Sequence, residues 1–162
     1  MRNYSALEFQ PSPGLNVLIG ANAQGKSNLL EAISLLGTGK SFRTSRESEL
    51  IASGADSATI TGEARLRAGG VRLACAIRTA DRATRKVYSI NGQNVRYAKF
   101  LGSITVVTFT PADLHLVTGS PALRRAMLNL TLSQQQPLYY RNLAHYKKTL
   151  SQKTALLRGG AS

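Results

Sequence analysis

The sequence predicts an α/β fold in which a glycine-rich loop and its helix precede a block of antiparallel strands, and a helical segment follows. Three observations carry this prediction. An apolar run, a glycine-rich loop and an amphipathic segment succeed one another over residues 15–36. The hydrophobic period becomes two over residues 58–110, and helical patterning returns from Ser120. We therefore predict a lobe at residues 1–115, with the loop and the strand insert, and a helical second-lobe segment at residues 116–162.

The first elements surround the glycine-rich loop. Leu15–Ile19 is short and apolar and follows a Pro-rich turn, so it predicts a buried strand. Apolar residues on one face of residues 29–36 predict a helix, and Gly37 stands where a left-handed cap would end it. The polar stretch that follows predicts a long connection with a short helix near Glu47–Ala52.

Alternating residues predict the strand block. Asn91-Gly92 is a strong hairpin-turn pair, and Gly69-Gly70 marks an earlier turn. A further β-branched run, Ile104–Phe109, predicts one more strand. The other predicted strands are Ala58–Leu66, Val71–Arg78 and Lys86–Ile90.

Two helices are predicted near the end of the chain. Ser120 and Pro121 are a typical cap and first residue, and this helix should end at Gln134–Pro137. Its apolar face holds Leu123, Met127 and Leu130. A long helix should begin at Leu138, and its apolar residues are spaced like a heptad repeat: Tyr139, Leu143, Tyr146, Leu150 and Leu157. The spacing fits either the start of a coiled coil or one amphipathic helix packed on its own domain.

Residues 20–27 match the phosphate-binding pattern G-x-x-x-x-G-K-[ST] in full. The glycines let successive backbone N–H groups point at one phosphate, and the helix that follows adds the positive end of its dipole. Lys26 should neutralise the β- and γ-phosphates of ATP, and the Ser27 hydroxyl should ligate Mg²⁺. The predicted cofactor site comprises Gly20, Ala21, Asn22, Ala23, Gln24, Gly25, Lys26 and Ser27.

The charge indicates a polyanionic partner, because 21 Lys and Arg face 8 Asp and Glu and give a net charge of +13. A membrane surface is disfavoured because no basic segment has a strongly apolar opposite face with Trp or Phe anchors. One basic group follows Asp113, after which no acidic residue occurs; a second, which includes Arg82, lies on and between the predicted strands. From these groups the candidate DNA contacts are Arg65, Arg67, Arg124, Arg125, Lys147 and Lys148.

Cysteine and histidine exclude several kinds of site. A single cysteine, Cys75, rules out a disulfide framework within the chain and reads as a small buried hydrophobe. Together with the lack of a signal peptide or membrane-length apolar run, it predicts a cytoplasmic protein. Because His115 and His145 are isolated, the sequence predicts no histidine metal cluster and no catalytic nucleophile–histidine pair.

Several segments together resemble the bacterial RecF family, DNA replication and repair ATPases related to SMC and Rad50 proteins. The match runs in order over nearly the whole chain, and Asn-Ala-Gln-Gly-Lys at residues 22–26 is more specific than the bare loop pattern. The matching stretches are Arg2–Tyr4, Pro13–Gly20, Asn22–Ala32, Thr38–Thr44, Glu49–Ile51, Phe109–Leu114, Gly119–Pro121 and Arg124-Arg125.

The resemblance implies an ABC-type ATPase head with a second, strand-rich lobe. Family members bind ATP with Mg²⁺ and dimerise on it, with the nucleotide between the loop of one subunit and the signature motif of the other. They bind DNA at single-strand/double-strand junctions. There they work with RecO and RecR to load RecA at gaps, in recombinational repair and the SOS response.

The chain also departs from the family pattern. Most members have Glu at the position of Ala21 and Asp-x-Glu at the position of residues 129–131, which are Asn-Leu-Thr here. The signature motif and the acidic strand end that activates water belong to a C-terminal half that the sequence does not show. We therefore predict an N-terminal fragment with an unstructured finish at residues 159–162, weak nucleotide binding and little or no ATP hydrolysis.

Two other functions remain open from the sequence. A P-loop phosphotransferase would need lid arginines, for which Arg43 and Arg46 are candidates, and a base near the loop, for which the sequence offers none. Arg43 has a second possible role, since it lies soon after the first helix and could reach either the nucleotide or DNA. A non-catalytic DNA-binding module that only senses nucleotide would show steep salt dependence without ATP turnover.

Overall fold

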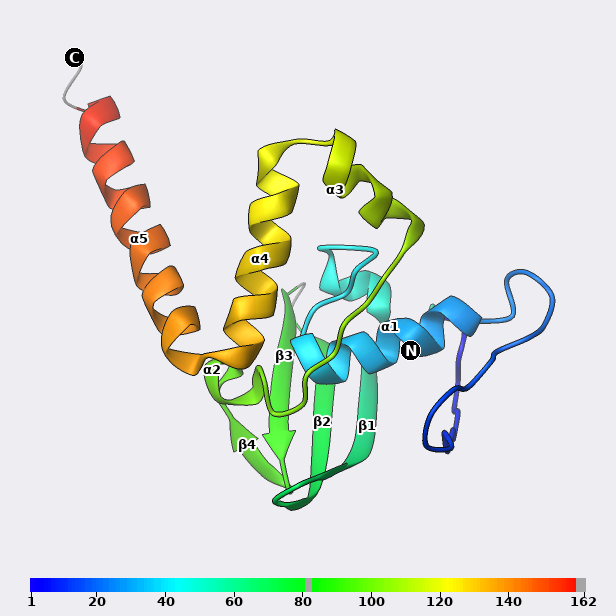
Figure 1. The fold of residues 1–162 in the computed structure, drawn as a ribbon. Helices are drawn as coiled ribbons and strands as arrows, with labels where there is room; N and C mark the ends of the chain where they lie inside the picture. Colours follow the sequence, from blue (N-terminus) through cyan, green and yellow to red (C-terminus); the bar gives the residue numbers. More distant parts are fainter. Residues whose placement is uncertain (81–82, 160–162) are drawn as a thin grey trace.

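The computed structural model describes residues 1–80 and 83–159. Its centre is a four-stranded antiparallel sheet in the order β1-β2-β3-β4, with helix α1 packed across one face (Figure 1). The strands are β1 (Ser57–Leu66), β2 (Gly69–Ala80), β3 (Ala83–Ile90) and β4 (Gln93–Val95). The helices are α1 (Lys26–Thr38), α2 (Tyr97–Phe100), α3 (His115–Thr118), α4 (Pro121–Gln135) and α5 (Pro137–Gly159), and the 3-10 turns are η1 (Glu47–Leu50) and η2 (Pro111–Leu114).

The strand block confirms the alternating pattern of the sequence. Leu73, Cys75 and Ile77 are buried on one face of β2, while the residues between them are more exposed. Asn91 and Gly92 both have positive φ, 50° and 80°, as a tight hairpin between β3 and β4 requires.

The core lies between α1 and the sheet. Leu35 and Leu36 of α1 pack with Leu50 and Phe100 and with the inward residues of β1 and β2. The C-terminal end of α1 is fixed by donors from the sheet side. Lys86 Nζ donates to the Gly39 carbonyl at 2.9 Å, and Tyr97 Oη donates to the Thr38 carbonyl at 2.7 Å.

Gly37 does not end α1, so that prediction is wrong. The helix continues to Thr38, and Gly39 takes the left-handed conformation with φ 65°. Gly37 is instead buried where a Cβ atom would overlap the Val106 side chain. A glycine at this position serves close packing rather than capping.

Two of the predicted strands, Leu15–Ile19 and Ile104–Phe109, are also wrong: neither segment forms a strand. Leu15 and Ile19 are 89% and 90% exposed, and Val107 is 85% exposed. A strand exists only with a neighbour to accept and donate its ladder hydrogen bonds. Among the described residues, no backbone group pairs with the backbone of either segment.

In the segment Ile104–Phe109, one side chain makes the hydrogen bonds that a neighbouring strand would make. The Gln134 amide of α4 accepts from Val106 N at 3.0 Å and donates to Val106 O at 3.2 Å. This pair of bonds copies the pairing of two strand residues and ties α4 to the chain that crosses over α1.

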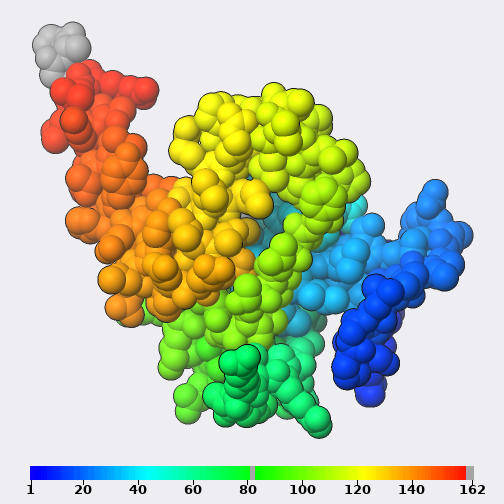
Figure 2. All heavy atoms as spheres, in the orientation of Figure 1, coloured from blue at the N-terminus to red at the C-terminus, as the bar shows by residue number. Residues whose placement is uncertain are grey.

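The last two helices form an open angle, and α5 projects from the body of the molecule (Figures 1 and 2). The start of α4 at Pro121 after Ser120 is confirmed, and so is the long helix predicted from Leu138, which begins one residue earlier, at Pro137. No residue of α5 is buried within its described range. Its contact with the body is made near its start, where Tyr140 packs edge-on against Tyr97 with ring centroids 5.4 Å apart.

Three other sequence predictions have different outcomes. The short helix near Glu47–Ala52 is confirmed as η1. Of the predicted unstructured finish at residues 159–162, Gly159 is instead the last residue of α5, and residues 160–162, like Arg82, lie outside the described residues. The division of the chain at residues 115 and 116 stays a prediction.

Candidate functional site

Residues 20–27, called the glycine loop below, lead directly into the first turn of α1. Gly25 is the N-cap of this helix and has φ 102°, a left-handed conformation that favours glycine. Ala23 also has a positive φ, of 65°, so the loop turns sharply twice within three residues. The loop lies at the exposed end of α1, away from the sheet (Figure 1).

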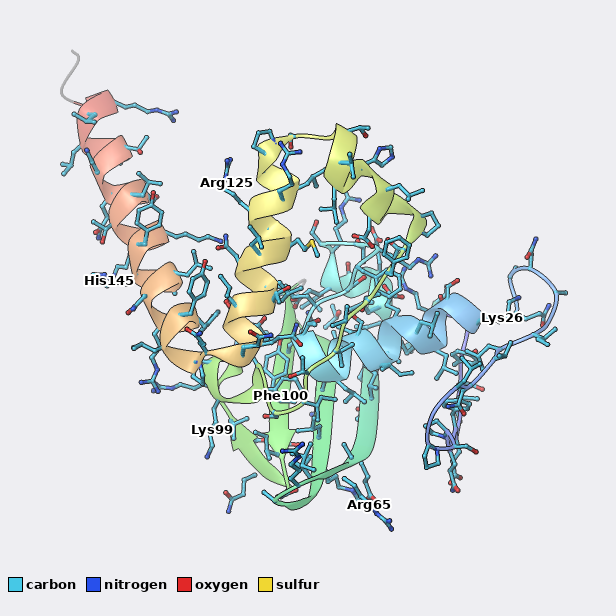
Figure 3. All side chains as sticks on the ribbon, in the orientation of Figure 1. Lys26, Arg65, Lys99, Phe100, Arg125 and His145 are labelled. Carbon is cyan, nitrogen blue, oxygen red and sulfur yellow. The ribbon has the colours of Figure 1, made fainter. Side chains whose placement is uncertain are left out.

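Lys26 closes the glycine loop on itself. Its Nζ atom donates to the carbonyl oxygens of Gly20 and Ala21, both at 2.6 Å. These bonds join the beginning of the loop to its end and place the ammonium group at the loop (Figure 3). The structure therefore places Lys26, the cation that the sequence predicts for this site, against the loop carbonyls.

The backbone of the loop fits a phosphate group. Within the described chain, the N–H groups of residues 21–27 donate to no protein acceptor. Gly25 O, by contrast, accepts from the N–H groups of Asn28 and Leu29 and starts the helix. Free N–H groups beside a lysine ammonium at a helix N-terminus form a site for an anion. The exposed Ser27 hydroxyl in the first turn of α1 adds a ligand of the kind that Mg²⁺ accepts beside phosphate oxygens.

The N-terminal turn, residues 1–4, braces the glycine loop from one side. Asn3 Nδ2 lies 3.5 Å from the Ala23 carbonyl, and Asn28 Nδ2 donates to Asn3 Oδ1 at 2.7 Å. A Cβ atom built on Gly25 would lie 2.5 Å from Tyr4 Oη. The turn therefore contacts the loop at two points and α1 at a third.

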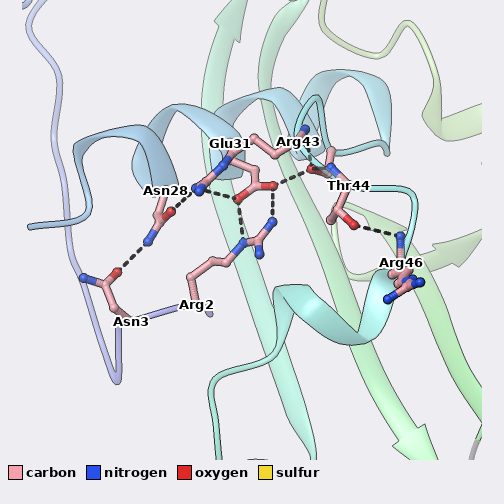
Figure 4. A network of polar contacts seen from close by, with 8 residues as sticks. Arg2, Asn3, Asn28, Glu31, Arg43, Thr44 and Arg46 are labelled. Atoms are coloured by element: carbon pink, nitrogen blue, oxygen red, sulfur yellow. Dashed lines mark hydrogen bonds and ion pairs between the residues drawn. The ribbon is translucent and has the colours of Figure 1, made fainter. Parts of the chain in front are cut away.

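A buried carboxylate holds this turn in place. Glu31 is 0% exposed and receives two hydrogen bonds from Arg2, at 2.9 Å to Oε2 and 2.8 Å to Oε1. The Ser41 hydroxyl donates to Oε1 as well, and Arg43 Nη1 lies 3.8 Å from Oε2 (Figure 4). Burial opposes ionisation of Glu31, but the hydrogen bonds from Arg2 and Ser41 and the charges of Arg2 and Arg43 outweigh it and lower its pKa.

Arg43 also reaches the first turn of α1, where its Nη1 donates to Asn28 Oδ1 at 2.5 Å. It thus lies beside the residue that follows Ser27. Arg46 instead pairs with Glu49 at 3.9 Å. Of the two arginines that the sequence offers for a phosphotransferase lid, only Arg43 contacts α1 next to the glycine loop, through Asn28.

The six candidate DNA contacts are exposed, but the structure does not bring them together. Arg65 lies at the far end of the β1–β2 hairpin and Arg125 on α4, at opposite ends of the view in Figure 3. Arg124 is engaged within the chain, since its Nη1 donates to the carbonyls of Leu116 and Gly119. Lys147 and Lys148 project from α5, which carries no acidic residue.

The other titratable groups do not build a second site in the described residues. No cluster of three His, Cys, Asp or Glu there has the arrangement of a metal site. Cys75 is fully buried, and desolvation raises its pKa to about 11, as expected of an unreactive core thiol. None of the helices in the described ranges has the length and apolarity to cross a membrane. Cytoplasmic localisation stays a prediction.

Sequence reasoning missed the residues that support the glycine loop. It assigned no role to Arg2, Asn3, Asn28 or Glu31, although all four lie in segments of the family resemblance. The one available signal was Glu31 itself, the only acidic residue of α1, which follows two leucines and precedes a mostly apolar stretch. A carboxylate at a helix position that becomes buried needs a partner.

Comparison with known proteins agrees with this arrangement. A family model described as the RecF/RecN/SMC N-terminal domain matches residues 1–140. DNA replication and repair protein RecF of Symbiobacterium thermophilum is 42% identical over 160 residues, which make up 97% of this chain and 41% of that protein. RecF of Lacticaseibacillus casei is 40% identical over 157 residues, 97% of this chain and 42% of that one.

Among solved structures, the recombination mediator protein RecF with ATP, from the RecFOR pathway, is similar to this chain. It superposes with a TM-score of 0.89 at 33% identity, covering 98% of this chain and 42% of that one. The chain therefore spans about two fifths of the length of the relatives that it matches.

Proposed function

Because the chain belongs to the RecF/RecN/SMC N-terminal domain family, we propose that it binds ATP with Mg²⁺ at the glycine loop and DNA through basic side chains of its helical segment. The α/β arrangement of a P-loop ATPase head, with an antiparallel insert and a helical end, is the fold of this chain. The function is that of a DNA replication and repair protein of RecF type.

The observation that carries the nucleotide proposal is the geometry of the glycine loop. Lys26 lies across the loop carbonyls, and the N–H groups of residues 21–27 donate to no acceptor in the described chain. The loop N–H groups would hold the phosphates, Lys26 would neutralise them, and Ser27 would ligate Mg²⁺. The bound metal supplies charge neutralisation and orientation of the phosphate oxygens. The neighbouring RecF structure contains ATP, which supports the same ligand here.

The DNA proposal rests on charge. The exposed Arg125, Lys147 and Lys148 lie on helices that have no acidic side chain, so their field is not locally compensated. Arg65 and Arg67 form a separate basic end of the sheet and are candidates for a second contact. Because Arg124 already binds two carbonyls, we place it last among the six.

The finer parts of the proposal follow the family resemblance. They are binding at single-strand/double-strand junctions, ATP-dependent homodimerisation, and cooperation with RecO- and RecR-type mediators in loading a recombinase at gaps. The neighbouring RecF structures, which belong to the RecFOR pathway, support the choice of mediators.

The deciding experiment is calorimetric titration of ATP with Mg²⁺ into the purified chain and into Lys26→Ala. We expect binding that the variant loses, with an unchanged circular dichroism spectrum because alanine suits a helix. Binding that survives in Lys26→Ala would contradict the assignment of the glycine loop.

Anisotropy of a labelled junction DNA, with and without ATP, then separates the two candidate functions. Stronger binding with ATP supports a nucleotide-dependent DNA-binding head. Steep salt dependence of DNA binding without ATP turnover favours the non-catalytic DNA-binding module that only senses nucleotide.

A further inference from the structure

The carboxylate of Glu31 connects three segments that meet beside the glycine loop. Arg2 reaches it from the N-terminal turn, and Ser41 and Arg43 reach it from the loop that follows α1. The side chain of Arg2 is 17% exposed and that of Glu31 is fully buried, so this ion pair is shielded from solvent. The pair is bidentate, which fixes the orientation of Arg2 as well as its distance.

Arg2 is also held in an unfavourable backbone conformation. Its φ is 52°, in the left-handed region that residues with a side chain seldom adopt. Two contacts maintain it: the side-chain pair with Glu31, and the hydrogen bond from Arg2 N to Leu50 O at 3.0 Å. Such strain persists only where surrounding contacts impose it. The consequence is that Asn3 and Tyr4 turn back toward the glycine loop.

Two routes lead from Glu31 to the glycine loop. The first passes through Arg2 to its neighbours, with Asn3 beside the Ala23 carbonyl and Tyr4 against Gly25. The second passes through Arg43 to Asn28, which in turn donates to Asn3. Both routes include Asn3, and Figure 4 shows the contacts forming a closed ring along one side of the first turns of α1.

We propose that Glu31 is a positioning residue of the nucleotide site, which holds the N-terminal turn against the glycine loop through Arg2 and holds Asn28 through Arg43. The carboxylate touches no phosphate in this role and acts through the residues that it orients. The expected effect of Glu31 on the affinity for ATP rests on the proposed function. Its expected effect on the order of the glycine loop does not.

The test compares Glu31→Gln with a second carboxylate at an ion pair, Glu47→Gln, whose side chain is 39% exposed. Glu47 pairs with Lys86 at 2.8 Å, and the side chain of Lys86 is only 8% exposed. This second pair lies at the opposite end of α1, where Lys86 also caps Gly39. Both variants therefore remove the charge from an ion pair that braces α1, but only the first lies beside the glycine loop.

Two quantities are measured in both variants: the Kd for ATP with Mg²⁺, and the backbone ¹⁵N order parameters of residues 20–25. For Glu31→Gln we expect a rise in Kd of about tenfold, since a charge-assisted hydrogen bond is lost. We also expect order parameters below about 0.6, the range of a flexible backbone. Glu47→Gln should leave both within experimental error.

Equal effects of the two variants would overturn the proposal, because ion-pair removal would then act only through overall stability. No effect of either variant would overturn it as well, because Glu31 would then not position the glycine loop. If the unaltered chain does not bind ATP, the proposed function fails, and the order parameters in the nucleotide-free chain still decide the positioning role. Should Glu31→Gln not fold, Arg2→Lys replaces it. This substitution keeps the positive charge but loses the bidentate geometry, and an unchanged loop in that variant would contradict the inference.

Discussion

Gly25 satisfies two structural constraints at once, on its backbone conformation and on the space beside its Cα atom. Its φ of 102° disfavours any side chain, and the Tyr4 ring occupies the space that a Cβ atom would need. The second constraint comes from a residue 21 positions earlier in the chain. The glycine was predictable from the loop pattern, but its contact with the N-terminal turn was not.

Gly25→Ala should destabilise the chain by more than Gly54→Ala does. Gly54 also has a positive φ, 79°, but a Cβ atom there meets nothing within 4 Å. We expect Gly54→Ala to lower the free energy of unfolding by about 1–2 kcal/mol because of the backbone conformation. Gly25→Ala should lower it by about 1–3 kcal/mol more, because the added Cβ displaces Tyr4. Urea unfolding of the two variants measures the difference, and equal losses would show that Tyr4 does not pack on this glycine.

The lowered pKa of Glu31 makes its contribution to stability depend on pH. Because the pKa in the folded chain lies below the ordinary value of 4.5, the contribution is complete above about pH 4.5 and is lost as pH falls through the folded pKa. The difference in unfolding free energy between the unaltered chain and Glu31→Gln should therefore be constant near neutral pH and shrink in acid. Urea unfolding across this range checks it; a difference that grows in acid would contradict the assignment.

At the scale of the elements, the strand block was predictable because local signals determine it. Alternation sets the inward face of β2, and Asn91-Gly92 sets the turn into β4. The apolar runs at 15–19 and 104–109 have equally good strand composition, but composition does not supply a pairing partner. The ring of contacts around Glu31 was unpredictable for a related reason, since it joins residues 2, 31 and 43 in space.

Gln134 provides the clearest element-scale test. Its side-chain amide makes both hydrogen bonds to the Val106 backbone, and the residue is 7% exposed. We expect Gln134→Ala to lower the unfolding free energy by about 1–3 kcal/mol, because a partly buried N–H and C=O lose their partner. The neighbouring exposed residue supplies the control, since Gln135→Ala should change stability by less than about 0.5 kcal/mol. Thermal or urea unfolding distinguishes the two.

At the scale of the whole molecule, the sequence predicts both the positive charge and its division into two basic groups, but not how far apart the two groups lie. The chain carries +13, and the structure separates the six candidate DNA contacts into the end of the β1–β2 hairpin and the helices α4 and α5 (Figure 3). Two separated basic surfaces allow either one to bind a polyanion alone. The net charge alone does not tell which of the two surfaces binds.

The double variant Lys147→Glu with Lys148→Glu tests the α5 surface. If both side chains contact phosphates, the slope of log K against log salt should fall by about 2, because each contact contributes about 0.9. Lys99→Glu, an exposed lysine on α2, serves as the control for loss of general charge. Anisotropy titrations of duplex and junction DNA at several salt concentrations give the slopes. An unchanged slope would move the DNA contact to the hairpin end.

The order of the strands has a consequence for how the chain folds. Each strand pairs only with its sequence neighbours, in the order β1-β2-β3-β4, so every ladder closes through a short connection. Small loops cost little entropy to close, and hairpins form in about 1–10 μs. Contacts between the N-terminal turn and α1 span 29 positions and close a much larger loop. We expect the sheet to form first and to serve as the template on which α1 docks, with the nucleotide site acquiring its shape last.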